Sequence, residues 1–398
     1  MYRLIMKMQR TKTALKTFRR HHTSHVTARV YAAKLQWHQA QYNLDQSPES
    51  SDLKQHERDA AMQYSRLALD EEAFYKQKSR IQWLQLGDKK TAFFHKSVLH
   101  RQSRNMINSL IDEERTLIID QNTIGGKAAE YFENLLTAHL PSVNLDQNLD
   151  NIYPNRISEE SARLVDRKIT RDDIKEALFS IPGSKAPGPD GFTAWFFKHA
   201  WSTIGRDFTD AILHFFDTGK LPKCVNATRI ALVPKKENPK GLPDYRPISC
   251  CNVVYKCISK LLERKLKHVL NDVVAPSQTT FLPDRQISDA ILIAQELMHN
   301  YHLQSGPPRC AIKVGLQKAF DTVSWQFIIA GLKSIGLSIG MINWIQTCIS
   351  TTHYSVSVSA RLFTRCKLRF VENTVCTSLS VFGFNLKLKS ISGSHEKG

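Results

Sequence analysis

The stretch of residues 309–325, written RCAIKVGLQKAFDTVSW, constrains the fold of this chain more than any other. An apolar run rich in β-forming residues leads into a short polar segment, after which a new helix is expected to begin. A strand that ends in a polar or acidic group is a common way to build a catalytic site. Here the residue at the end of the strand is Gly315, which can neither bind a metal ion nor transfer a proton.

The charge of the chain indicates a polyanionic partner. There are 55 Lys and Arg residues against 37 Asp and Glu, which gives a formal net charge of +18. The charge is uneven, because residues 1–43 contain nine Lys or Arg and no acidic residue. Nucleic acid fits this pattern better than a membrane surface does. A basic surface that only keeps the protein in solution is the alternative interpretation.

The cysteine spacing and the hydropathy of the chain limit the cellular compartments in which the protein is expected. The eight cysteines show no zinc-finger spacing, which is typical of reduced thiols in an intracellular protein. No apolar run is long enough for a transmembrane helix, and the N-terminus lacks the apolar core of a signal peptide. We therefore expect an intracellular protein without a membrane partner, with the nucleus as one candidate compartment.

Hydrophobic periodicity predicts a mainly helical chain. Thr170 and Asp173 form a capping-box pattern at the start of one of these helices. The Lys- and Pro-rich segment 234–249 is expected to be a loop, and 45–55 a polar linker. A hairpin is expected at 105–119, and strands at 228–233 and 354–358. The predicted helices cover 1–44, 56–86, 89–103, 123–138, 170–181, 192–202, 204–218, 252–270, 287–302, 324–335 and 339–350.

Residues 184–192, SKAPGPDGF, combine two glycines and two prolines near Lys185. This composition fixes a rigid, turning backbone. Spacing alone favours a purely structural turn over a binding loop.

Several motifs in one order make the sequence resemble the reverse transcriptase of plant LINE-type (non-LTR) retrotransposons. The resemblance covers about residues 71 to 359. It rests on KSRIQWLQLGDKKTAFFH (78–95), KAPGPDGF (185–192), RIALVPKKENPKGLPDYRPISCCNVVYKCISKLLERKL (229–266), QTTFLPDRQISDAILIAQEL (278–297) and KVGLQKAFDTVSW (313–325).

The resemblance implies an α+β fold: an incomplete right-hand polymerase with helical fingers and a truncated palm, preceded by a helical basic extension. The domains expected from it are a basic helical segment with its linker (1–55), a helical linker region (56–140), the reverse-transcriptase fingers (158–308), a partial palm (309–360) and a divergent tail without regular structure (361–398).

The resemblance also implies partners and roles. The family works on a primer–template of RNA and DNA, with two Mg²⁺ ions held by palm aspartates. By resemblance, Lys235 or Lys236, and Arg246, would neutralise the nucleotide triphosphate, and Phe320 would lie against the sugar. The remaining motif residues are Lys185, Gly188, Asp190, Gln278, Arg285 and Asp321.

The chain departs from the family pattern at the catalytic positions. Gly315 stands where the family has its first palm aspartate, and Asp321 lies six residues further on, too far to replace it. The aromatic-x-Asp-Asp hairpin is absent from the sequence. The only Asp-Asp pair, Asp172-Asp173, is interpreted as stabilising a helix start. We therefore expect no intact catalytic residues and no productive Mg²⁺ binding.

Similarity is expected to stop near Arg361, and a frameshift or a mispredicted exon is our hypothesis for the tail. The sequence thus predicts a fragment of a retrotransposon RNA-directed DNA polymerase, an enzyme by family that is catalytically inactive. The alternatives are a non-enzymatic nucleic-acid-binding protein and a translated relic without a function.

Overall fold

The structure of this protein is a computed structural model. It describes residues 1–22, 25–81, 91–112, 114–137, 156–274, 285–299, 324–359 and 361–366. The chain divides into two compact units: an N-terminal unit, Ile5–Ile107, and a C-terminal unit formed by Met1–Leu4 together with Asn108–Gly398. In the part of the chain that is described, no helix is long and apolar enough to cross a membrane.

The N-terminal unit is helical. Its helices are α1 (Tyr2–His22), which begins in the other unit, α2 (Val26–Gln46), α3 (Ser51–Ser79) and α4 (Thr91–Asn105). The rings of Trp37 and Tyr64 stack at 5.2 Å between α2 and α3, and the Trp37 indole donates a hydrogen bond of 2.7 Å to Glu57.

The helical character predicted for this unit is confirmed, but three boundaries differ. The stretch 1–44 forms two helices, with His25 at a left-handed φ of 53° before α2, and α3 ends at Ser79 where 86 was expected. The polar stretch 45–55 is mostly helical, and only residues 47–50 connect α2 to α3. The reason is a helix cap: the hydroxyl of Ser50 accepts a hydrogen bond from the Leu53 amide, which starts α3 at residue 51.

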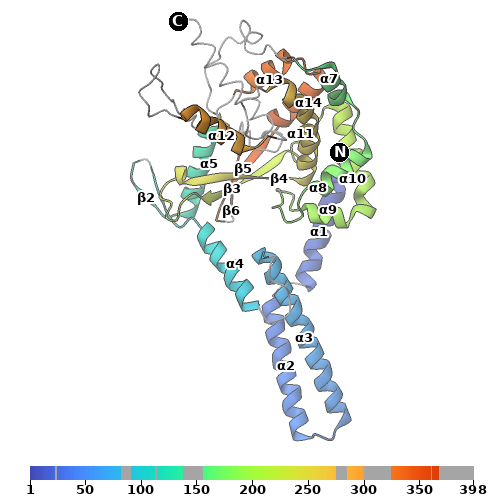
Figure 1. The fold of residues 1–398 in the computed structure, drawn as a ribbon. Helices are drawn as coiled ribbons and strands as arrows, with labels where there is room; N and C mark the ends of the chain where they lie inside the picture. The colour runs from blue at the N-terminus through green and yellow to red at the C-terminus, as the bar shows by residue number, and fades with distance from the viewer. Residues whose placement is uncertain are drawn as a thin grey trace. The chain divides into compact units, whose positions relative to one another are not determined.

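A four-stranded mixed sheet forms the centre of the C-terminal unit (Figure 1). Its strands are β3 (Ala227–Pro234), β4 (Tyr245–Cys251), β5 (His353–Val358) and β6 (Arg361–Cys366), in the order β4-β3-β5-β6. β3 is antiparallel to β4 and parallel to β5, and β6 runs antiparallel to β5. Alternate residues of β3 and β5 are buried, so one face of the sheet carries core side chains.

Helices cover this sheet and build most of the C-terminal unit, so the described fold is mainly helical with small sheets, an α+β arrangement. α5 (Gln121–Thr137) packs on β5 and β6. A small hairpin, β1 (Leu110–Ile111) with β2 (Leu117–Ile118), precedes it, as predicted. The other helices are α7 (Glu159–Asp166), α8 (Arg171–Ser180), α9 (Ala194–His199), α10 (Trp201–Thr218), α11 (Val253–Val273), α12 (Ile287–Met298), α13 (Trp325–Ser334) and α14 (Ile339–Ser350).

Local signals in the sequence set several of these boundaries. The capping box of α8 is present: the Thr170 hydroxyl accepts from the Asp173 amide, and the Asp173 carboxylate accepts from the Thr170 amide. Gly219 ends α10 at a φ of 66°, in the left-handed region that glycine favours. These features confirm the predicted start of α8 and the predicted end of α10.

Two predictions for the C-terminal unit are wrong. The last five residues of the segment expected to be a loop, 234–249, belong to strand β4, which pairs with β3 along seven residues, and the first, Pro234, ends β3. The first six residues of the tail expected to lack regular structure, 361–398, form β6. β4 lies at an edge of the sheet, where a strand tolerates a proline such as Pro247 because one row of backbone groups needs no partner.

Candidate nucleic-acid interface

Lys235, Lys236 and Arg246 all lie at the loop end of the hairpin that β3 and β4 form. Arg246 lies opposite Val233 in the ladder, and the Lys235 amide donates a hydrogen bond of 2.8 Å to the carbonyl of Asp244. All three cationic side chains are exposed. The loop end of the hairpin therefore carries three exposed cations within residues 235–246, and such side chains are suited to binding phosphate.

Asp244 fixes the conformation of this hairpin. Its carboxylate pairs with the Lys236 ammonium at 2.8 Å and accepts from the backbone amides of Lys240, at 2.8 Å, and Gly241, at 3.2 Å. The hydrogen bond from Lys236, followed by those from the two amides, lowers the pKa of Asp244 to about 2. Sequence reasoning missed Asp244, although an aspartate after Gly-Leu-Pro is a common turn residue.

Replacing Asp244 by asparagine should destabilise the protein in a pH-dependent way. Because the pKa of the carboxyl is about 2 in the folded chain against an ordinary 3.8, its contribution is present above about pH 4 and is lost as the pH falls through about 2. Urea unfolding of both proteins at several pH values measures the difference. Asp217→Asn, at an exposed position near the end of α10, is the control. A difference for Asp244→Asn that stays constant between pH 7 and pH 2 would contradict this role.

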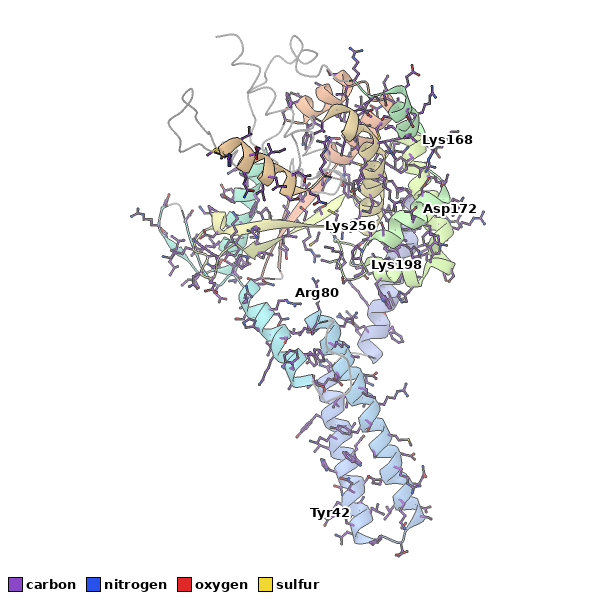
Figure 2. All side chains as sticks on the ribbon, in the orientation of Figure 1. Tyr42, Arg80, Lys168, Asp172, Lys198 and Lys256 are labelled. Carbon is purple, nitrogen blue, oxygen red and sulfur yellow. The ribbon has the colours of Figure 1, made fainter. Side chains whose placement is uncertain are left out.

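Residues 184–192 form a turn that is bound to the start of α11. The Asn252 side chain accepts a hydrogen bond of 3.1 Å from the Asp190 amide and donates to the carbonyls of Cys224 and Val225, at 2.9 and 3.1 Å. Lys256, labelled in Figure 2, donates a hydrogen bond of 2.8 Å to the carbonyl of Ala186. The side chains that hold the turn are thus Asn252 and Lys256, which sequence reasoning did not single out.

Within the turn, the motif residues have structural contacts. The Asp190 carboxylate accepts from the Phe192 amide at 3.0 Å, and the Lys185 amide donates to the Pro182 carbonyl at 3.2 Å. Gly188 is buried against Asn252. These contacts support the interpretation of a structural turn. The Lys185 side chain is exposed, so it alone among these residues points to solvent.

The other predicted site residues are only partly placed. Arg285 donates a hydrogen bond of 3.4 Å to the carbonyl of Val274. Gln278, Gly315, Phe320 and Asp321 lie outside the described residues.

Part of the C-terminal unit is similar to a known protein family. The family profile described as Reverse transcriptase (RNA-dependent DNA polymerase) matches residues 233–376, which include the β3–β4 hairpin from its turn onward. Over these residues the chain is similar to the reverse transcriptase family. The match also continues past residue 361, where the resemblance was expected to stop, so that expectation is wrong.

The relatives are transposon proteins. The chain is 28% identical to the Transposon TX1 uncharacterized 149 kDa protein of Xenopus laevis over 282 residues, 71% of this chain and 21% of that protein. It is 27% identical to the Retrovirus-related Pol polyprotein from type-2 retrotransposable element R2DM of Drosophila melanogaster, over 54% of this chain and 19% of that one. A Pol polyprotein of Popillia japonica is 26% identical, over 56% and 30%. The kinship with non-LTR retrotransposon proteins is confirmed at modest identity, and the plant origin stays a prediction.

The chain spans less than a third of the length of these relatives. Reverse transcriptases generally use Mg²⁺ and bind RNA and DNA templates, and Mg²⁺ takes carboxylate oxygens as its protein ligands. Among the described residues, no group of three or more His, Cys, Asp or Glu could hold a metal ion. At position 315 the sequence supplies a glycine. The loss of the two-metal site stays a prediction from the sequence.

Proposed function

We propose that this chain is part of a retrotransposon RNA-directed DNA polymerase whose fingers bind nucleic-acid and nucleotide phosphates but which does not polymerise DNA as it stands. The observation that carries the proposal is the placement of Lys235, Lys236 and Arg246 at the loop end of the β3–β4 hairpin, inside the region that matches the reverse transcriptase family. In this proposal residues 158–308 are the fingers and 309–360 a partial palm of an incomplete right-hand fold.

Phosphate binding follows from the properties of the hairpin. An arginine guanidinium can donate two parallel hydrogen bonds to one phosphate, and lysine adds a compact charge. Lys236 is held by Asp244, while the side-chain ammonium of Lys235 donates to the Pro243 carbonyl at 2.6 Å. Both lysines therefore start from a fixed place on the loop, which lowers the conformational entropy lost when a phosphate binds.

Loss of catalysis follows from Gly315. A two-metal polymerase places carboxylates where the ions neutralise developing charge, and such stabilisation is worth several kcal/mol. Glycine has no side chain to supply it. The Asp172-Asp173 pair does not compensate, because it lies in the first turn of α8, where Asp173 serves the helix cap and an ion pair with Arg167 at 2.8 Å.

A primer-extension assay on the purified chain, with either magnesium or manganese, should show no template-dependent synthesis. Each 1.36 kcal/mol of lost stabilisation is about tenfold in rate, so the missing carboxylate alone lowers the rate by several orders of magnitude. Gly315→Asp should not restore synthesis, because this sequence has no second aspartate pair free for the metal. Template-dependent extension by the wild-type chain would contradict the proposed inactivity, and extension by the variant would show that one carboxylate is sufficient.

A second candidate is a nucleic-acid-binding protein without enzymatic activity, and the net charge of +18 favours it. The two candidates differ in what the phosphate-binding residues serve. Both candidates require binding to nucleic-acid phosphates. Gel-shift assays on single-stranded RNA over a range of salt concentrations test this binding, because retained phosphate contacts make affinity fall steeply with salt. Absence of binding at low salt would contradict both candidates and leave a relic without a function.

A further inference from the structure

A cleft of about 520 Å³ opens in the C-terminal unit between the α7–α8 turn and α11, and the proposed function does not use it. It shares no residue with the β3–β4 hairpin. Its walls also include Leu164, Ile169 and Leu261, so the cleft has an apolar floor as well as charged sides. The basic residues that line it are Arg167, Lys168, Arg264, Lys265, Lys267 and His268.

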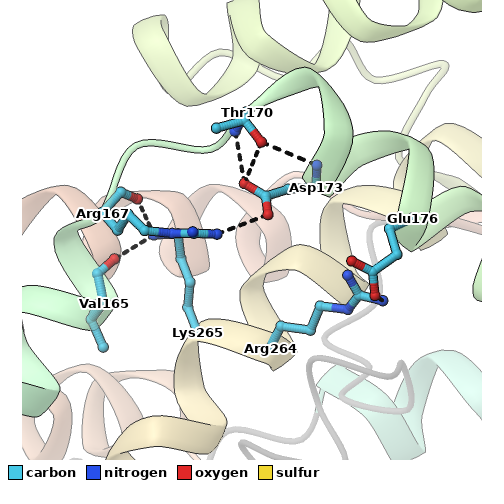
Figure 3. A network of polar contacts seen from close by, with 7 residues as sticks. All are labelled: Val165, Arg167, Thr170, Asp173, Glu176, Arg264 and Lys265. Carbon is cyan, nitrogen blue, oxygen red and sulfur yellow. Dashed lines mark hydrogen bonds and ion pairs between the residues drawn. The ribbon is translucent and has the colours of Figure 1, made fainter.

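Lys265 is built into the wall of this cleft. Only 8% of the residue is exposed, and its ammonium donates to the carbonyls of Val165 and Arg167 at the C-terminal end of α7 (Figure 3). The last carbonyls of a helix lack partners and carry partial negative charge, so this end of α7 holds the cation in place. Among the described residues, no carboxylate lies within ion-pair distance of the Lys265 nitrogen. Burial, and next the Arg167 guanidinium, lower its pKa.

The two acids of the cleft are already occupied. Asp173 accepts hydrogen bonds from Thr170 and pairs with Arg167, and Glu176 pairs with Arg264 at 2.9 Å (Figure 3). Five Lys and Arg residues thus face two acids, which leaves the cleft with a net positive charge. The two guanidinium groups are engaged by these acids and the Lys265 ammonium by carbonyls, so the exposed Lys168 and Lys267 supply the cations that suit a phosphate group.

The positive surface continues beyond the cleft along α11. Lys260, Arg264 and Lys267 are spaced four and three residues apart, so they lie on one face of the helix. Glu263 lies among them, 3.6 Å from Lys260 and 3.7 Å from Lys267, so the row carries three cations against one acid. At 1.5 Å per residue the row extends about 10 Å, which is longer than a single phosphate group. Across the cleft, Lys168 projects from the turn between α7 and α8 and is exposed (Figure 2). The length of the row favours a ligand with several phosphates in sequence.

We propose that this cleft and the basic face of α11 bind successive phosphates of a nucleic-acid strand, as a contact surface separate from the polymerase hairpin. Exposed Lys168 and Lys267 contact the strand from opposite walls. Buried Lys265 holds the α7 end in position between them.

The test uses the full chain and two double variants with the same change in net charge. Lys168→Gln with Lys267→Gln changes the cleft. Lys220→Gln with Lys333→Gln changes two exposed lysines of the same unit outside the cleft. The probe is a fluorescent oligouridylate of about thirty nucleotides, and its affinity is measured by anisotropy between about 50 and 200 mM salt. Circular dichroism confirms that both variants are folded.

The cleft variant should bind about tenfold more weakly, and the slope of log affinity against log salt should fall by about 1.4, which corresponds to two lost phosphate contacts at about 0.7 each. The control should change affinity by less than about twofold, because its charges are screened from the strand. Equal losses in the two variants would overturn the proposal. A thermal-shift measurement with inorganic phosphate tests whether the cleft binds free phosphate instead of the phosphates of a nucleic-acid strand. If phosphate stabilises the wild type but not the cleft variant, while both bind RNA equally, the cleft is a site for free phosphate and the proposal is wrong.

Discussion

Gly188→Ala is expected to lower the free energy of unfolding of the C-terminal unit by about 2–4 kcal/mol. A Cβ at this position would lie 2.2 Å from the side-chain oxygen of Asn252, 2.4 Å from its backbone nitrogen and 2.6 Å from the carbonyl carbon of Cys251. Two of these three atoms are backbone, so no rotamer change relieves the overlap. The turn must move away from α11, which also breaks the hydrogen bond between Asp190 and Asn252.

The matched control is the same substitution at Gly126. This glycine lies inside α5 with no atom within 4 Å of an added Cβ, and alanine is the better helix former. Gly126→Ala should therefore raise stability by about 0.5–1 kcal/mol. Urea unfolding followed by circular dichroism measures both variants. Two effects of the same sign, or a change below about 1 kcal/mol for Gly188→Ala, would contradict the close approach of the turn to α11.

Local sequence signals predicted most helices of this fold but not the partners of each element. The Thr170–Asp173 capping box and Gly219 act within a few residues, so they can be recognised in one sequence. β4 was missed because it contains Pro247 and follows a Lys- and Pro-rich segment, and it becomes a strand through its pairing with β3. β6 was missed for the same reason, since it forms on the edge of β5.

The residues of the candidate site also fall into two groups, those that the sequence could predict and those that only the fold identifies. The family motif predicted the roles of Lys235, Lys236 and Arg246, and the hairpin register explains why all three lie at the same end of the hairpin. The turn at 184–192 could be predicted from its glycines and prolines, but Asn252, about sixty residues away, could not. In the sequence, Lys265 is one of several cationic residues on a predicted helix. Only the fold shows that it differs from its neighbours, because the carbonyls it binds come from another helix about a hundred residues earlier.

Lys265→Met should therefore destabilise the protein far more than the same change at Lys267. Methionine keeps most of the hydrocarbon chain but removes both hydrogen bonds to the end of α7. The carbonyls of Val165 and Arg167 then lose their ammonium partner, and an unsatisfied buried polar group costs about 1–3 kcal/mol. Because removing a desolvated charge offsets part of this cost, we expect a net loss of about 2–4 kcal/mol in the free energy of unfolding.

Lys267→Met is the control, because Lys267 is exposed on the same helix and its ammonium lies 3.7 Å from Glu263 in a weak surface pair. Its effect should stay within about 0.5 kcal/mol. Urea unfolding at neutral pH compares the two variants, and protease sensitivity of residues 159–166 reports whether α7 has detached. Equal stabilities would show that the end of α7 is held by packing alone, and the ammonium would then have no structural role in the wall of the cleft.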